Sequence, residues 1–433
     1  NRIPPWQGRK FDWRFAHPLS QVVQVMSAVK NPKNPQAVLK KRYRVGIRLL
    51  DWSQGFCYRL FPGILEVARS GHDLELVFEQ PSGGDIAPVR IDKDWQGDGL
   101  LVYRYTATEA KAWKKRGIKV VNLSAEQPAN GPHFPRVTMD NEAAGVMAAR
   151  HLMTLGLQRF AFWHDPHRRY SLERLEGFRN ELTRAGFTTE VLNIPSSHYA
   201  EEERATRNAN LAWKMLSKLE TPVGLFAKDD ISAVCAMRAL GTLGLRCPED
   251  VPVVGVADDT VYCNITRPAL SSVRFPGRMI GNRAMQLLIS MMNGEVVADD
   301  RRLCIPPIEL TVRESTGLVE LPDEVVTKAM RFIREHTPRR LVGVDELCRA
   351  AGVSRELLRQ RFQNLLGRTP KEEIDRQRAE VICEKLRQTT WKIERIAEET
   401  GFGAADELCR FFKRTMDQTA GEYRKQMSGG NFR

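Results

Sequence analysis

Hydrophobic and polar positions alternate in a regular way from residue 43 to residue 259. Short apolar runs such as YRVGIRLL at 43–50 predict buried strands, and longer amphipathic segments such as TATEAKAWKKRG at 106–117 predict the helices between them. Strands that alternate with helices of about 10 to 15 residues are typical of parallel sheets. Because a second series of the same kind begins with RFAFWH at 159–164, we predict an α/β fold with two lobes, each built on its own sheet.

Toward the C-terminus the apolar positions follow the period of α-helices, and two segments repeat one arrangement. The segments are VDELCRAAGVSRELLRQRFQNL at 344–365 and IERIAEETGFGAADELCRFFKRT at 393–415. Each contains an amphipathic helix, a glycine (Gly352 or Gly401), an apolar residue and a second helix, which is the pattern of a helix-turn-helix. Any helix pair with a glycine turn resembles this pattern. Two copies joined by the helix-length segment 371–387 favour an all-α domain that binds double-stranded DNA.

The outer faces of the two predicted second helices differ. In the first unit Ser354 is the expected cap, and the core positions are Leu357, Leu358, Phe362 and Leu365. Its outer positions are Arg355, Glu356, Arg359 and Gln360. In the second unit the core positions are Leu408, Phe411 and Phe412, and the outer positions are Ala404, Ala405, Asp406, Cys409, Arg410 and Lys413. Since Arg and Gln read base edges, we expect the first unit to set most of the sequence preference and the second to act more through phosphate contact.

Polar residues follow the predicted strands of both lobes. Ligands of open parallel sheets bind outside the carboxyl ends of the strands, which nominates Asp51, Trp52, Ser53, Gln54, Asp140, Asp165, Lys228, Asp229, Asp230, Asp258 and Asp259. Several carboxylates that converge on one cleft suit a polyhydroxylated ligand, because each carboxylate accepts two hydroxyl hydrogen bonds. An Asp after a strand is also a common helix cap, so each residue alone has that alternative.

The net charge of +13 is unevenly distributed along the 433 residues. Residues 1–44 hold ten Lys/Arg against the single Asp12, whereas residues 323–433 hold 23 Lys/Arg against 18 Asp/Glu. The excess therefore lies mostly in an N-terminal tail (residues 1–42) that we expect to be disordered, and charge gives the DNA hypothesis little support. No apolar run is long enough for a membrane helix and no secretory signal is visible, so we expect a cytoplasmic protein without membrane contact.

Cysteine and histidine positions give no sign of a metal centre. The eight cysteines form no CxxC pair, and we interpret them as buried free thiols. The string HDPH, with His164 and His167, lacks a helical pattern and a third ligand, so a loop is the better interpretation. We expect no cofactor, no metal and no catalytic residue, because the sequence has no P-loop, no GxGxxG after a strand and no GxSxG elbow.

Residues 344–426 resemble the DNA-binding domain of the arabinose-regulator (AraC) family. The similar motifs are GVSRELLRQRF, GRTP at 367–370, IERIAEETGF, FFKRT and EYRK at 422–425. Base-contacting roles carried over from the family fall on Glu356, Arg359 and Gln360 in the first unit and on Ala405, Asp406, Cys409 and Arg410 in the second. The family's second Gly-x-x-Pro is replaced here by Asp417 and Ala420, which makes the last turn unusual.

Residues 43–318 are similar to the effector domain of lactose-repressor-type regulators and to type I periplasmic sugar-binding proteins. The motifs are GIKVVNLSAEQP, VTMDNEAAGVMAARHLMTLG, RLEGFRNELTRAGF, LFAKDDISAVCAMRALGTLGLRCPEDVPVVGV and PALSSVRFP. The resemblance implies a sugar held by Asp140, Arg174 and the later strand-end residues. Two positions depart from the family, with Lys228 in place of a common Asn and Ala257 in place of a common Asp.

The order of the two domains, with the sugar domain first, resembles the xylose operon regulators, which are transcriptional activators. That resemblance implies a homodimer that binds promoter half-sites, a sugar effector such as D-xylose, and contact with RNA polymerase. We expect hinges near 139–147 and 271–281, and a linker with a connecting helix over 319–343. The alternatives are a carbohydrate sensor without direct DNA readout and, less favoured, a sugar-processing enzyme.

Overall fold

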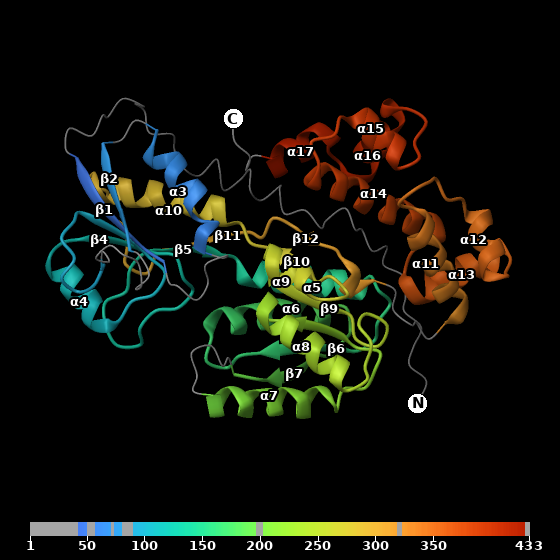
Figure 1. The fold of residues 1–433 in the computed structure, drawn as a ribbon, viewed down its shortest axis with the longest axis horizontal. Coiled ribbons are helices and arrows are strands. Elements are labelled where there is room, and N and C mark those ends of the chain that lie inside the picture. Colours follow the sequence, from blue (N-terminus) through green and yellow to red (C-terminus); the bar gives the residue numbers. More distant parts are fainter. Residues whose placement is uncertain are drawn as a thin grey trace.

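A computed structural model describes residues 42–49, 57–70, 73–79, 90–195, 202–317 and 323–428. The tail expected over residues 1–42 lies outside these ranges apart from Arg42. Two α/β lobes lie next to each other, and the C-terminal helices flank them along one side (Figure 1). The predicted architecture, an α/β domain with two lobes that each have their own sheet, followed by an all-α domain with two helix-turn-helix units, is confirmed.

The first lobe is built on a parallel sheet with the strand order β11-β5-β4-β3-β1-β2. Its strands are β1 (Tyr43–Arg48), β2 (Leu74–Phe78), β3 (Gly99–Val102), β4 (Lys119–Asn122), β5 (Arg136–Met139) and β11 (Arg302–Ile305). Its helices are α3 (Phe61–Ala68), α4 (Ala107–Lys115) and α10 (Gly277–Met292). Helix α10 packs against α3 and contacts the central strands β3, β4 and β5.

The second lobe has the strand order β12-β10-β9-β8-β6-β7, in which only the β10–β12 pair is antiparallel. Its strands are β6 (Phe160–His164), β7 (Glu190–Asn193), β8 (Gly224–Ala227), β9 (Val253–Ala257), β10 (Ser271–Arg274) and β12 (Leu310–Thr311). Its helical segments are α5 (Asn141–Met153), α6 (Arg169–Arg184), α7 (Glu202–Leu216), α8 (Asp230–Thr242), α9 (Thr260–Ile265) and the 3₁₀ turn η3 (Glu314–Thr316). Strands β6 and β8 are buried along their whole length, as expected for strands covered on both faces.

Helices α5 and α6 cross at unusually short range. A Cβ atom at Gly145 would lie 2.1 Å from the carbonyl oxygen of Arg174, and one at Gly177 would lie 2.0 Å from that of Glu142. Only glycine fits at these two positions, because any larger residue would overlap the neighbouring backbone. The close crossing brings the first turn of α5 next to the middle of α6, where Arg174 is located.

The chain passes between the lobes at three places. The first is Asp140, between β5 of the first sheet and α5, which packs in the second lobe. The second comprises residues 275–276, between β10 and α10, and the third comprises residues 306–309, between β11 and β12. The first two lie within the segments where we expected hinges. The third was not anticipated, because β11 and β12 are too short to give a sequence pattern.

The C-terminal domain consists of seven helices in the described part of the chain. They are α11 (Glu324–His336), α12 (Val344–Ala351), α13 (Arg355–Leu366), α14 (Pro370–Gln388), α15 (Ile393–Glu399), α16 (Ala405–Met416) and α17 (Ala420–Ser428). Helices α12 and α13 form the first helix-turn-helix unit, and α15 and α16 form the second, with the long helix α14 between them (Figure 1). Each unit has its own hydrophobic core.

The local signals for these helices act largely as predicted. Gly352 and Gly401 take left-handed backbone conformations, with φ of 69° and 78°, and Ser354 Oγ accepts the amide hydrogen of Leu357. In α13, the expected core residues Leu358 and Phe362 are buried, whereas Leu357 and Leu365 are only partly buried, with Leu365 packed against the core. Leu366, which was not among the expected core positions, is also buried. The unusual last turn is also well formed: Asp417 adopts φ of 56°, and Thr419 and Glu422 cap α17 reciprocally.

Candidate functional site

The residues predicted to bind a ligand are only partly within the described ranges. Asp51, Ser53 and Gln54 lie outside them. The structure describes Asp140, Arg174, Lys228, Asp229, Asp258 and Asp259, and it distributes them over two polar clusters and a helix cap.

The first cluster consists of Tyr170, Arg174, Lys228 and Asp229, and we call it the Tyr170 cluster. The guanidinium carbon of Arg174 lies 4.9 Å from the centroid of the Tyr170 ring, and Lys228 Nζ lies 5.7 Å from the same centroid. Lys228 Nζ also donates to the Tyr170 hydroxyl at 3.3 Å and to the Asp229 carboxylate. Two cations thus lie close to one aromatic ring, which is a favourable arrangement when the cations are desolvated.

Burial and charge set the protonation states of the Tyr170 cluster. The side chain of Lys228 is 1% exposed and that of Asp229 is 20% exposed. Burial alone lowers the pKa of Lys228, but Asp229 and Tyr170 outweigh it and hold the pKa above its ordinary value. Burial likewise raises the pKa of Asp229, but Lys228 and the amide of Ser232 bring it well below its usual range. Both groups are therefore charged near neutral pH.

Contacts to neighbouring helices and to the other lobe hold Arg174 in place. Its Nε donates to Asn141 Oδ1 at 3.0 Å, and its Nη1 donates to the carbonyl oxygen of Lys228. Asn141 in turn donates to Glu173 Oε2 at 2.9 Å, and the same carboxylate pairs with Arg302 of the first lobe at 2.7 Å. Glu173 is 4% exposed. The Tyr170 cluster is therefore connected to both lobes.

Residues of the first lobe also approach the Tyr170 cluster. Tyr103 follows β3, and its pKa is raised by burial first and by its electrostatic interaction with Cys57 and Tyr170, with Arg174 acting in the opposite direction. Glu126, from the loop after β4, accepts the backbone amide of Arg169 at the first turn of α6 at 2.9 Å. A carboxylate at a helix N-terminus is favoured by the helix dipole. This bond therefore links the lobes at the start of the helix that carries Tyr170 and Arg174.

Several predicted ligand residues also act as helix caps. Asp140 Oδ1 accepts the amide of Ala143 at 2.9 Å, and Asp229 Oδ1 accepts that of Ser232 at 2.7 Å. Asp259 Oδ1 accepts the amides of Val261 and Tyr262 at the start of α9. The capping alternative considered for these residues is thus realised. The cap leaves Asp229 with one carboxylate oxygen directed to Lys228. For Asp140, the cap is the side-chain hydrogen bond that the described part of the chain provides.

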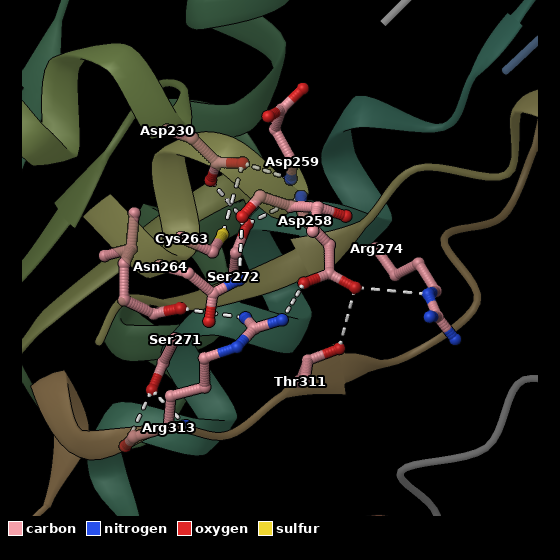
Figure 2. Close-up of polar contacts among 12 residues, drawn as sticks. Asp230, Asp258, Asp259, Cys263, Asn264, Ser271, Ser272, Arg274, Thr311 and Arg313 are labelled. Atoms are coloured by element: carbon pink, nitrogen blue, oxygen red, sulfur yellow. Dashed lines mark hydrogen bonds and ion pairs between the residues drawn. The ribbon is translucent and has the colours of Figure 1, made fainter. Parts of the chain in front are cut away.

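The second cluster, shown in Figure 2, surrounds the end of β9. Asp258 pairs with Arg274 at 3.1 Å and with Arg313 at 2.7 Å, and it accepts the Thr311 hydroxyl at 3.0 Å. Burial raises the pKa of Asp258, but Arg313 and Arg274 bring it below the ordinary value. Asp259 pairs with Arg59, which precedes α3 in the first lobe, at 3.1 Å. These two carboxylates are thus neutralised by arginines, and their role as sugar ligands stays a prediction.

Asp230 lies in the same cluster but has the opposite electrostatic character. It is 2% exposed and accepts the Ser272 hydroxyl at 2.5 Å and the amide of Asp259 at 2.8 Å. Burial, with a smaller contribution from the neighbouring charge of Asp258, raises its pKa to about 6. The arginines that neutralise Asp258 do not pair with Asp230 in the described contacts. The two adjacent carboxylates therefore titrate in different pH ranges.

Sequence reasoning missed Tyr170, Asn141, Glu173 and Arg302. These residues lie within helices or on an edge strand, whereas the rule used to nominate sites considers only the residues that follow strands. The spacing of Tyr170 and Arg174, four residues apart on one helix, places both side chains on one face and was an available signal.

The candidate DNA-contacting residues lie on the outer faces of α13 and α16. Arg355, Glu356, Arg359 and Gln360 are exposed on the first helix, and Asp406, Arg410 and Lys413 are exposed on the second. Ala405 and Cys409 are half-buried. The two arginines of α13 are paired with carboxylates, Arg355 with Asp345 and Arg359 with Glu356 at 2.6 Å. Contact with DNA by these arginines therefore requires that they exchange a carboxylate for a phosphate or a base.

Two expectations about cysteine and histidine can be compared with the structure. All eight cysteines are free thiols, but the expectation that they are buried holds only for Cys57, Cys263 and Cys383. Cys235 is exposed and the other four are partly buried. The interpretation of HDPH as a loop was wrong for His164, which is the last residue of β6, whereas His167 lies in the turn that follows. His164 Nδ1 lies 2.8 Å from Ser171 Oγ, a hydrogen-bond distance. No group of three or more residues suited to a metal ion occurs within the described ranges, and no helix among them is long and apolar enough to cross a membrane.

Comparisons with known proteins agree with this architecture. Residues 149–316 match a family described as periplasmic binding protein-like domain, and residues 347–426 match a helix-turn-helix domain. The xylose operon regulatory protein of Haemophilus influenzae is 30% identical over 299 residues, which are 68% of this chain and 75% of that protein. The chain belongs to the xylose operon regulatory protein family. This confirms the resemblance stated from the motifs.

Further members of the xylose operon regulatory protein family and one solved structure extend the match. The protein of Escherichia coli K12 is 29% identical over 342 residues, covering 77% of this chain and 86% of its own. The structure of the xylose-binding transcription activator xylR superposes with a TM-score of 0.55 at 25% identity, covering 89% of this chain and 98% of the other. The chain is therefore a sugar-responsive, DNA-binding transcription regulator and not an enzyme.

Proposed function

We propose that the effector is D-xylose or a closely related sugar, bound between the lobes at the Tyr170 cluster. The observation that carries this assignment is the Tyr170 cluster, in which the buried Arg174 and Lys228 and the partly exposed Asp229 offer ionised donors and a carboxylate beside the partly buried Tyr170 ring. Sugars need this combination, because their hydroxyls pair with charged groups while their C–H faces pack on aromatic rings. The relatives' names support a pentose.

We further propose that Asp140, with Asp258 and Asp259 at the end of β9, completes the polar surface on the second-lobe side. Asp140 is partly exposed at the first crossing, and its cap of α5 uses only one of its two carboxylate oxygens, Oδ1. Asp51, Ser53 and Gln54, which follow β1 in the sequence, are the first-lobe candidates. A sugar bound between the lobes shifts the protein toward one interlobe arrangement only if the sugar has a higher affinity for that arrangement than for the other.

The DNA contacts are assigned to the two recognition helices. Arg355, Arg359 and Gln360 of α13 have the side chains suited to base readout, with Glu356 available as an acceptor for cytosine. In α16, Arg410 and Lys413 are suited to phosphate contact. Ala405, Asp406 and Cys409 are assigned to the surface of α16 that fits against the DNA groove. Two units on one chain suit two successive major grooves of a promoter half-site.

The regulator is proposed to act as a homodimer. Exposed apolar side chains occur in three segments that meet at Arg59. Arg59 of the first lobe donates to the carbonyl oxygen of Ala257 and to the carboxylate of Asp259 in the second lobe, and it packs on Gly277 at the start of α10. The exposed apolar side chains are Tyr58, Val261, Tyr262, Ile265 and Met279, with exposed fractions from 37% to 65%. Apolar side chains gathered in this way mark interaction surfaces, and a second copy would cover them. We also propose activation of a sugar catabolic operon through contact with RNA polymerase, by analogy with the activator above.

A thermal-shift experiment with the full-length protein tests the effector assignment. D-xylose should raise the unfolding temperature in a concentration-dependent manner, because a ligand bound only by the folded state stabilises it. L-arabinose, D-ribose, D-glucose and D-glucuronate serve as comparisons. A shift by another sugar and none by D-xylose would contradict the assignment of the effector. A shift by D-xylose that persists unchanged in Arg174→Ala would contradict the site.

A further inference from the structure

A network of side chains joins two of the three lobe crossings. Arg274 is the last residue of β10, directly before the crossing at 275–276, and Glu309 is the last residue of the crossing at 306–309. Arg274 Nη1 donates to Glu309 Oε1 at 3.1 Å, and the backbone amide of Arg274 donates to the carbonyl oxygen of Glu309 at 2.7 Å. The two crossings are therefore tied to each other by side chain and backbone, and a change in one displaces the other.

The same network reaches a strained turn at the end of β9. Arg274 Nε pairs with Asp258 at 3.1 Å, as Figure 2 shows. Ala257 and Asp258 have φ of 137° and 54°, in the region that residues with a side chain rarely adopt. Such conformations persist only where the surroundings hold them, and they cluster at ligand sites and switches. The turn is held from the first lobe by Arg59, which donates to the carbonyl oxygen of Ala257.

The DNA-binding domain joins this network through Tyr423 of α17. The Tyr423 ring belongs to the core of the second helix-turn-helix unit, where it packs edge-on against Phe412 at 5.6 Å. Its hydroxyl donates to Glu309 Oε2 at 2.8 Å. Tyr423 is 1% exposed and Glu309 is 8% exposed. A buried carboxylate that loses a hydrogen bond is strongly destabilised, so the second unit is bound to the crossing at 306–309 in this conformation.

The first helix-turn-helix unit is anchored to a different part of the effector domain. Arg368, which lies between α13 and α14, donates from Nη2 to the carbonyl oxygen of Thr154 at the C-terminus of α5, at 2.6 Å. Burial lowers the pKa of Arg368, although Glu373, which binds the same guanidinium at 2.6 Å, acts to raise it. One unit is thus attached to a helix of the second lobe, and the other is attached to a crossing between the lobes.

We propose that Asp258, Arg274, Glu309 and Tyr423 form a switch that transmits lobe movement to the second helix-turn-helix unit. A change in the angle between the lobes moves the crossings relative to α5. Because the two units are attached on opposite sides of that movement, the spacing and orientation of α13 and α16 change with it. This inference rests on the proposed function, since it requires sugar binding to change the interlobe arrangement. Allosteric coupling requires an element whose arrangement both sites influence, and we assign that role to this set of four residues.

The test is the ratio of DNA affinities with and without D-xylose, measured by fluorescence anisotropy on the full-length protein and a promoter fragment. Tyr423→Phe removes only the hydroxyl and keeps the ring packed on Phe412. Tyr43→Phe is the matched control, because its hydroxyl donates to the carbonyl oxygen of Met292 at 3.1 Å, far from the DNA-binding domain. Typical couplings change affinity by roughly 5- to 150-fold. We expect Tyr43→Phe to keep the wild-type ratio and Tyr423→Phe to bring it to within about twofold of one.

The outcomes separate this inference from the proposed function. A wild-type protein whose DNA affinity does not respond to D-xylose would overturn the proposed effector, and the switch with it. A wild-type response that Tyr423→Phe retains in full would overturn the switch alone. Glu309→Gln is the second variant if Tyr423→Phe fails to fold. This variant keeps an acceptor for Tyr423 but loses the charge that binds Arg274. It should also bring the ratio of DNA affinities with and without D-xylose closer to one, and a ratio equal to that of the wild type would contradict the switch.

Discussion

Removing either charge of the Lys228–Asp229 ion pair should lower the stability of the protein, but by different amounts. Asp229→Asn keeps the cap of α8, because asparagine caps helices as well as aspartate does, but it removes the charge that neutralises Lys228. Lys228 is 1% exposed, and besides Asp229 its ammonium group contacts Tyr170, whose hydroxyl lies at 3.3 Å and whose ring centroid lies at 5.7 Å. Removing one partner of a buried ion pair costs about 3–5 kcal/mol. We expect a loss of that size in the free energy of unfolding of the second lobe at pH 7.

The opposite substitution should be milder. In Lys228→Met, Asp229 keeps the amide of Ser232 and the Tyr170 hydroxyl, and its side chain is 20% exposed. The uncompensated charge is thus partly hydrated, and we expect a loss of about 1–2 kcal/mol. Urea unfolding of the full-length protein, followed by far-UV circular dichroism, measures both variants through the shift in the midpoint.

The two variants should also differ in pH dependence. In the wild-type protein the pKa of Lys228 is raised and that of Asp229 is lowered, so the pair contributes fully between the two unfolded-state values, roughly pH 4 to 10. In Asp229→Asn, burial lowers the pKa of Lys228 below its unfolded value, and stability should rise from pH 7 toward pH 10 because the unfolded chain then binds more protons. Equal losses below about 1 kcal/mol in both variants, with no such rise, would refute the buried pair.

Three further predictions concern the DNA interface and Asp230. Arg359→Ala should weaken specific DNA binding by about 10-fold or more in anisotropy titrations while leaving D-xylose affinity unchanged; equal loss of both would indicate misfolding. Asp345→Asn frees Arg355 from its carboxylate and should tighten DNA binding a few-fold, whereas Asp375→Asn, the same charge change on α14, should have a smaller effect; equal effects would mean that only net charge matters. The pKa of Asp230 is raised to about 6, so the wild-type protein should lose stability as pH rises from about 4 to 6, and Asp230→Asn should remove that slope in pH-dependent thermal melts.

The general architecture was predictable because strong periodic patterns encode it. The alternation of buried strands and helices gave both lobes, and the glycine turns at Gly352 and Gly401 gave both helix-turn-helix units. The third crossing at 306–309 was not predictable, because β11 has four residues and β12 has two. Segments of this length carry too few positions for an apolar period to be visible.

The candidate site was predictable only in part. Strand-end reasoning found Lys228 and Asp229 but not Tyr170, which lies in the first turn of α6 and contacts both of them. The same reasoning placed Asp258 with the other carboxylates, whereas the structure surrounds it with Arg274 and Arg313. Those arginines come from distant segments, and a sequence pattern does not specify which charges meet in space.

The most direct test of the central claim is the affinity of the full-length protein for a promoter fragment from neighbouring sugar-catabolic genes, measured with and without D-xylose. We predict a sequence-specific complex whose affinity changes at least about fivefold with the sugar, and no such change in Arg174→Ala, which lacks the guanidinium of the Tyr170 cluster. An affinity that is the same with and without D-xylose, in a protein that still binds the fragment specifically, would contradict the account.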